Sequence, residues 1–172
     1  MTDHNNARFE WAKSVMEIKP NHKILEIGCG AGFAVELIAP LLSKGKILAI
    51  DQSKPMIDKA IKRNERFITA GKADFIKIAL NDFSSENTFD KIFCFNVNVF
   101  WTKKSVAQEM EVIKNCLSDN GDFYTFFGPL FAGGLKKISA PVKKNIENEG
   151  FRVPDVLYDK KTNCCGFIAT RE

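Results

Sequence analysis

The 172-residue sequence lacks the features that mark several whole classes of protein. No apolar stretch reaches the roughly 18 to 20 residues that a membrane-spanning helix needs. The first residues, MTDHNNARFEWAK, do not follow the charged-then-apolar order of a signal peptide. We therefore expect no membrane span and a cytoplasmic location.

The cysteines do not form the pattern of a disulfide framework or of a zinc site. There are five, an odd number, and no two of them are spaced as a CxxC pair. Buried thiols in a reducing compartment are the simpler interpretation. We expect no bound metal.

Basic tracts and histidines are also scarce. The 25 Lys and Arg residues nearly balance the 21 Asp and Glu residues, so nucleic-acid binding has only weak support. His4 lies in the N-terminal segment and His22 precedes the first predicted strand. Neither is a convincing general base, and no catalytic residue is predicted.

Short apolar runs alternate along the chain with longer amphipathic stretches. The short runs suit strands that are buried on both faces of a sheet. Helices are predicted after Gly32, from Pro55, over residues 103–118 and around residues 139–149. The predicted strands are residues 23–27, 46–50, 75–79, 90–95, 122–127, 153–159 and 165–170.

This alternation predicts an α/β fold, because parallel strands need crossover connections. We expect a Rossmann-like, doubly wound, mostly parallel sheet of seven strands in a three-layer αβα arrangement. Residues 160–163 could join the last two strands as a hairpin, which makes the C-terminal strand antiparallel. No linker divides the chain, so we expect a single domain over residues 1–172, with an N-terminal helical segment at 1–20 and a core at 21–172.

The densest glycine cluster follows the first predicted strand, in ILEIGCGAG. Gly28, Gly30 and Gly32 permit positive φ angles and a close approach of a ligand to the backbone. Glu26 places a carboxylate inside the buried strand, which is costly unless a cationic partner is present. A dinucleotide fingerprint would need glycine at Phe33, so a nicotinamide-dependent dehydrogenase is disfavoured. The sequence also has no nucleoside-triphosphate loop of the usual form.

A second acid, Asp51, ends the second predicted strand. An acid at this place can accept hydrogen bonds from a ribose. Its alternative role is to cap the helix that starts near Pro55, but Ser53 is closer to that position. We therefore favour ribose binding for Asp51.

Together ILEIGCGAG and ILAIDQSKPMIDKA resemble the first two motifs of class I S-adenosylmethionine-dependent methyltransferases. FDKIFCFNVNVFW and VIKNCLSDNGDFYTFF resemble later segments of that family, so the likeness covers nearly the whole chain. NVNVFW is similar to the small-molecule and uncharacterised branch, the methyltransferase types 11 and 25. It lacks the proline pair typical of enzymes that methylate nucleic-acid bases.

The resemblance implies S-adenosylmethionine as the cofactor, with S-adenosylhomocysteine as the product, and a set of binding residues. Glu26 would orient the amino group of the methionine part, Asp51 would hold the ribose hydroxyls, and Asn96 would lie below the methionine. Asp82 and Phe83 would contact the amino group and the ring of adenine. The remaining implied contacts are Gly28, Cys29 and Gly30 through their backbone, and Gln52 and Met56 beside the adenine. Met56 has an alternative place in the core.

The resemblance also implies an acceptor pocket after the fourth strand. Asn98, Phe100 and Trp101 would line it, although the two aromatic residues could instead cover the sheet. We expect methyl transfer to a small, partly apolar or aromatic molecule. The alternatives are a protein or RNA acceptor reached with a partner subunit, and a non-catalytic S-adenosylmethionine-binding module. A chain this short has no inserted substrate domain, so a second subunit, as in a homodimer, could complete the site.

Overall fold

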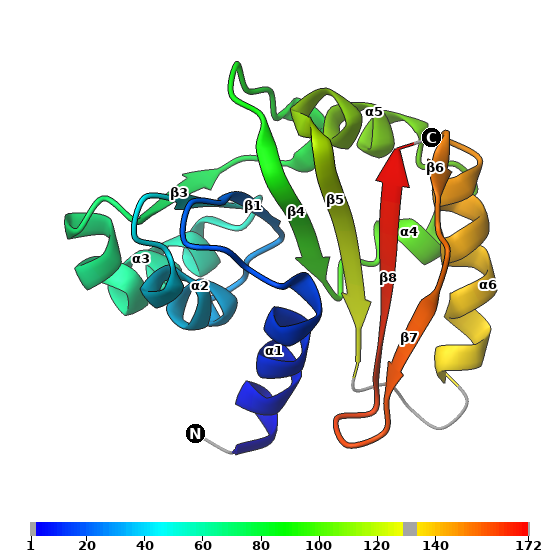
Figure 1. Ribbon diagram of the computed structural model, residues 1–172, viewed down its shortest axis with the longest axis horizontal. Coiled ribbons are helices and arrows are strands. Elements are labelled where there is room, and N and C mark those ends of the chain that lie inside the picture. Colours follow the sequence, from blue (N-terminus) through cyan, green and yellow to red (C-terminus); the bar gives the residue numbers. More distant parts are fainter. Residues whose placement is uncertain (1–2, 129–133, 172) are drawn as a thin grey trace.

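The computed structural model, which describes residues 3–128 and 134–171, contains one mixed sheet between two layers of helices (Figure 1). In this described part the sheet has eight strands in the order β3-β2-β1-β4-β5-β8-β6, and β7 also pairs with β8. The strands are β1 (Lys23–Ile27), β2 (Lys46–Asp51), β3 (Ala73–Lys77), β4 (Phe89–Phe95), β5 (Leu117–Phe127), β6 (Phe151–Arg152), β7 (Val156–Asp159) and β8 (Cys164–Arg171).

The strand directions confirm the predicted fold class. Strands β1 to β5 are all parallel to one another, whereas β8 runs antiparallel to β5, β6 and β7. The strand predicted at 153–159 is confirmed only as the shorter β7, and the additional strand β6 precedes it, so the described residues form eight strands and not the predicted seven. Pro154 lies between β6 and β7 and has no N–H with which to continue a ladder.

The helices divide between the two faces of the sheet, and each face has its own apolar core. The first face is covered by α1 (Asp3–Met16), α2 (Phe33–Ile38) and α3 (Lys54–Thr69). The opposite face is covered by α4 (Val99–Thr102), α5 (Ala107–Cys116) and α6 (Gly134–Glu147). Two 3₁₀ turns are η1 (Ala39–Leu41) and η2 (Leu80–Asp82). None of the helices in the described ranges has the length and apolar character needed to cross a membrane.

Local signals explain where several elements end. Pro40 ends α2 as expected, and the chain passes there into η1. The predicted helix over 103–118 is shorter, because residues 103–106 form a connection and Leu117 already belongs to β5. Parallel pairing of β1 with β2 and β4 brings their carboxyl ends to one edge of the sheet, where the functional site lies.

The buried face of α3 leaves out two of the helix's apolar side chains. Ile57, Ala60 and Asn64 are buried, whereas Met56 and Ile61 are 38% and 41% exposed. Met56 therefore does not take its alternative place in the core. The helix begins at Lys54, and its rotation is set by packing against α2 and β3.

Candidate functional site

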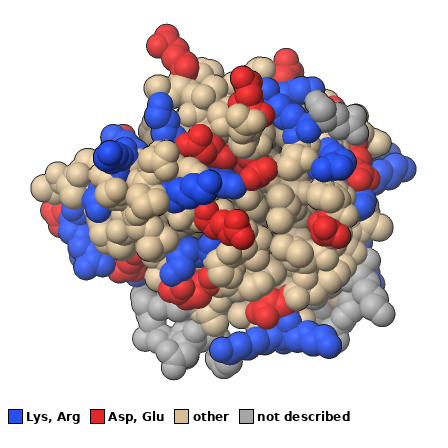
Figure 2. Space-filling view, viewed as in Figure 1, with Lys and Arg blue, Asp and Glu red and all other residues tan. Residues whose placement is uncertain are grey.

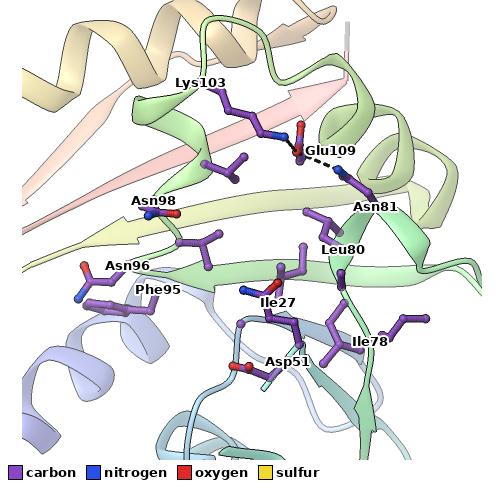
Figure 3. A pocket seen from close by; sticks show the side chains of 16 residues that line it. Ile27, Asp51, Ile78, Leu80, Asn81, Phe95, Asn96, Asn98, Lys103 and Glu109 are labelled. Carbon is purple, nitrogen blue, oxygen red and sulfur yellow. Dashed lines mark hydrogen bonds and ion pairs between the residues drawn. The ribbon is translucent and has the colours of Figure 1, made fainter. Parts of the chain in front are cut away.

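A cavity of about 500 Å³ lies at the carboxyl ends of β1, β2, β3 and β4 (Figure 3). Its walls come from the segments that follow these strands and from the start of α5. Apolar side chains such as Ile27, Ile78 and Leu80 lie between polar ones. Of the residues predicted to bind the cofactor or the acceptor, the cavity lining includes Gly28, Asp51, Gln52, Asn96 and Asn98.

The glycine turn lies between β1 and α2, and its three glycines have positive φ angles of 70°, 53° and 73°. The N–H groups of Gly28 and Cys29 both donate to the carbonyl of Ile50, at 2.8 and 3.1 Å, which holds the turn against the end of β2. A Cβ added at Gly30 would meet no atom within 4 Å, so the backbone there borders open space. A Cβ at Gly32 would lie only 2.6 Å from Nδ2 of Asn64 on α3. Gly32 is therefore required for helix packing.

Asp51 connects the glycine turn to the start of α3. One carboxylate oxygen accepts from the N–H of Gly30 at 2.9 Å, and the other accepts from the N–H of Ser53 at 2.8 Å. Ser53 occupies the N-cap position, as its place in the sequence suggests, but its side chain makes no capping bond. An ionised carboxylate has about four acceptor positions, so Asp51 can still accept from a ligand in the cavity.

Glu26 lies beneath this turn and is only 2% exposed. Its Oε2 atom is buried and has no hydrogen-bond partner among the described residues. Burial, with the nearby charge of Asp51, raises the pKa of Glu26 well above its ordinary value. A buried carboxyl group without a partner is costly, and a cationic group from a ligand would relieve that cost.

Helix α1 brings a cation to the ends of β4 and β5. The Arg8 guanidinium lies 4.6 Å from the ring centroid of Phe9 and 5.2 Å from that of Phe95. It donates to the carbonyl of Gly128 at 3.4 Å, while its Nε is buried and unpartnered among the described residues. Burial lowers the pKa of Arg8. Arg8 was missed in the sequence, because a single cation in an N-terminal helix looks like any solvated residue.

Asn96 joins the ends of β4 and β5 through two hydrogen bonds. Its Nδ2 donates to the carbonyl of Gly128 at 3.0 Å, and the N–H of Gly128 donates to its Oδ1 at 2.8 Å. The φ angle of Asn96 is 58°, a left-handed conformation that asparagine tolerates better than most residues. Both ends of this amide are thus already used within the protein.

A polar network on α5 was also missed. Glu109 is 4% exposed, and its Oε1 accepts from Nζ of Lys103 at 2.5 Å and from Nδ2 of Asn81 at 3.2 Å. Burial acts to raise the pKa of Glu109, but hydrogen bonds from Lys103, from its own backbone and from Asn81 outweigh burial and lower it. In the sequence Glu109 is simply one acid on an amphipathic helix.

Comparisons with known proteins decide the family. A family model described as a methyltransferase domain matches residues 24–121, more than half of the chain. The chain belongs to this methyltransferase-domain family. It is 34% identical over 112 residues to an uncharacterised protein of Rickettsia prowazekii and 30% identical over 124 residues to a protein-L-isoaspartate O-methyltransferase of Thermosipho melanesiensis.

These alignments cover 64% and 72% of the chain but only 20% and 59% of the two relatives. A solved structure of a SAM dependent methyltransferase from Aquifex aeolicus has the same fold. Its TM-score is 0.77 at 22% identity, over 94% of this chain and 88% of that one.

In this methyltransferase domain several predicted site residues lie outside the cavity lining. Phe100 is fully buried and Phe83 is 5% exposed, both in the core, so Phe100 takes its alternative place against the sheet and Phe83 does not line the cavity. Trp101 packs edge-on against Phe127, with ring centroids 4.8 Å apart. Met56 is exposed on α3 and does not line the cavity.

Asp82 also lies outside the lining, although Asn81 is part of it. Both belong to the 3₁₀ turn η2, in which successive side chains point about 120° apart. Leu80 and Asn81 of this turn line the cavity, and Asp82 does not. Cys29 is 7% exposed, and burial raises the pKa of its thiol, so only its backbone is available to a ligand. Within residues 3–128 and 134–171, no cluster of three or more His, Cys, Asp or Glu side chains could hold a metal ion.

Proposed function

We propose that the protein is an S-adenosylmethionine-dependent methyltransferase whose cofactor lies in the cavity at the ends of β1 to β4. Glu26 carries this proposal, because its buried Oε2 has no partner among the described residues and lies beneath a turn that borders open space at Gly30. The amino group of the cofactor would supply that partner. Membership of the methyltransferase-domain family and the shared fold support the same conclusion.

Glu26, Gly30 and Arg8 are not part of the cavity lining itself, and other residues in and around the cavity suit the remaining parts of the cofactor. Asp51 would accept hydrogen bonds from the ribose while it keeps those from Gly30 and Ser53. Arg8 would pair with the carboxylate, and Gln52 would border the nucleoside. When bound, the cofactor supplies a methyl group already activated by its sulfonium. The protein therefore needs mainly to align the acceptor with that methyl group and to exclude water.

We propose a small, partly apolar or aromatic acceptor. Asn98 offers an exposed amide between Val97 and Val99 on the cavity wall, which suits a molecule with few polar groups. The acids of the cavity already accept hydrogen bonds from within the protein, so an acceptor that needs no strong base fits best. We further propose that the enzyme works in the cytoplasm, with a homodimer as one way to complete the site.

A protein acceptor is the second candidate. It is favoured by the similarity to a protein-L-isoaspartate O-methyltransferase, 30% identical over 72% of this chain. Nucleic acid has less support, because Lys and Arg are interspersed with Asp and Glu on the face shown in Figure 2. A non-catalytic module would bind the cofactor equally well, and only formation of S-adenosylhomocysteine in the presence of an acceptor would separate it from an enzyme.

Calorimetric titration of S-adenosylmethionine into the parent protein and Asp51→Asn tests the proposal. We expect the variant to bind at least about tenfold more weakly, a loss of about 1.4 kcal/mol. Asp74→Asn is the matched control, because Asp74 pairs with Lys46 at 2.5 Å at the amino ends of β2 and β3. The proposal fails if the folded parent shows no binding at millimolar ligand, or if Asp74→Asn binds as weakly as Asp51→Asn.

A further inference from the structure

The Lys103–Glu109–Asn81 network lies across the cavity from Asp51, with Leu80 between them (Figure 3). Its members come from three separate segments: η2, the connection that follows α4, and the first turn of α5. Glu109 has one oxygen occupied by two donors, Lys103 and Asn81. The proposed function gives this network no role, yet its carboxylate is almost completely buried in the cavity wall.

The turn η2 explains why Asn81, and not Asp82, reaches this network. The N–H of Asp82 bonds to the carbonyl of Ala79, and the N–H of Phe83 bonds to that of Leu80, both at 3.1 Å. This tight winding sends Phe83 into the core and leaves Asp82 exposed outside the cavity lining. The acid that the family resemblance assigned to adenine is therefore not among the residues that line the cavity.

The chemistry of adenine matches what the network offers. With the ribose at Asp51, the flat base would extend along the apolar side chains of Ile78 and Leu80. The edge of adenine far from the ribose carries the 6-amino group, a hydrogen-bond donor that needs oxygen acceptors. Because Nδ2 of Asn81 is committed to Glu109, the side-chain oxygen of Asn81 is directed elsewhere, and no described residue donates to it.

We infer that Glu109 and Asn81 bind the 6-amino group of the cofactor's adenine, in place of Asp82. This inference rests on the proposed function and specifies how the same site recognises the base. Lys103 acts as a positioning residue, because its ammonium group holds Glu109 in place from the side of α4. The hydrogen bonds from Lys103 and Asn81 lower the pKa of Glu109, which keeps the carboxylate ionised and able to accept.

The test compares S-adenosylhomocysteine with S-inosylhomocysteine, in which an oxygen replaces the 6-amino group. We would measure both affinities by calorimetry for the parent, Glu109→Gln, Asn81→Ala and the matched control Asp82→Asn. The parent should prefer the adenosine compound by at least about tenfold, since a site built for a donor rejects an analogue without it. Glu109→Gln and Asn81→Ala should reduce that preference to about threefold or less, whereas Asp82→Asn should retain it.

Circular dichroism and thermal unfolding establish that each variant is folded. If Glu109→Gln does not fold, the comparison of Asn81→Ala with Asp82→Asn still shows which residue binds the 6-amino group. Both residues are exposed on η2, so we expect these two variants to fold. Loss of the preference in Asp82→Asn alone would overturn the inference, as would equal affinity of the parent for both compounds. The proposed function survives either result, because the parent still binds. A folded parent that binds neither compound would overturn the proposed function itself.

Discussion

At the scale of single residues, Glu26 lowers the stability of the folded protein and is nevertheless the residue on which the proposed cofactor binding depends. Burial and the charge of Asp51 raise its pKa well above the ordinary 4.5. The folded protein therefore keeps a proton that the unfolded chain releases as the pH rises above that value. Since the native state binds more protons there, the free energy of unfolding falls with rising pH until the pKa of the folded state is reached.

Glu26→Gln should remove this pH dependence, because the amide carries no titrating proton. Without ligand, the variant should lose less Tm than the parent as the pH rises from about 5 to about 8. It should also bind S-adenosylmethionine at least about tenfold more weakly, because the anionic partner of the amine is gone. Thermal unfolding across the pH series and calorimetry measure the two effects. Glu10→Gln, an exposed residue of α1, is the control, and parallel Tm curves for the parent and Glu26→Gln would contradict this account.

At the scale of elements, the glycine turn combines two separate tasks. Gly30 borders the space proposed for the cofactor, and Gly32 allows α2 to pack against Ala60 and Asn64 of α3. Nδ2 of Asn64 also donates to the carbonyl of Gly32 at 3.0 Å, which fixes this contact. The two glycines share a left-handed backbone, so an alanine at either position carries a similar conformational cost of about 1–2 kcal/mol.

The comparison of Gly30→Ala with Gly32→Ala separates these tasks. Gly32→Ala should be less stable than Gly30→Ala by about 1–3 kcal/mol, because its methyl group overpacks the α2–α3 contact. Gly30→Ala should lose more affinity for S-adenosylmethionine, because its methyl group enters the open space beside the turn. Urea unfolding of both variants checks the predicted order of stability, and calorimetry checks the predicted order of affinity. Equal destabilisation, or a greater loss of affinity in Gly32→Ala, would show that the turn has been assigned wrongly.

At the scale of the whole molecule, the two cores enclose all five cysteines as free, buried thiols. Burial raises the pKa of Cys94 to about 12, and the pKa of Cys29 is also raised, so little reactive thiolate forms. Any fast reaction therefore requires the fold to open.

A thiol reagent should react with every cysteine of the native protein more slowly than with glutathione, which serves as the control thiol. After unfolding in urea, it should modify all five cysteines. The slow native reaction should accelerate in parallel with the unfolding equilibrium as urea increases. Absorbance of the released chromophore measures both. One thiol that reacts rapidly in native buffer would mean that part of a core opens independently of the rest.

The amino-acid sequence by itself determined the order of strands and helices, the glycine turn and the two acids beside it. These features depend on local patterns, on the handedness of crossover connections and on the meeting of parallel strand ends at one edge. The rotation of short helical turns does not follow from such patterns. For this reason the sequence left two places open for Phe100, which is in the core, and did not show that Asp82 lies outside the cavity lining.

Only the tertiary structure decided which distant residues complete the site. Glu109 meets Asn81 across 28 positions, and Arg8 meets Gly128 across 120. No local pattern marks such residues, because their surroundings form only when the helices pack onto the sheet. The unpartnered oxygen of Glu26 became visible in the same way, since burial and the absence of a partner are properties of the folded chain.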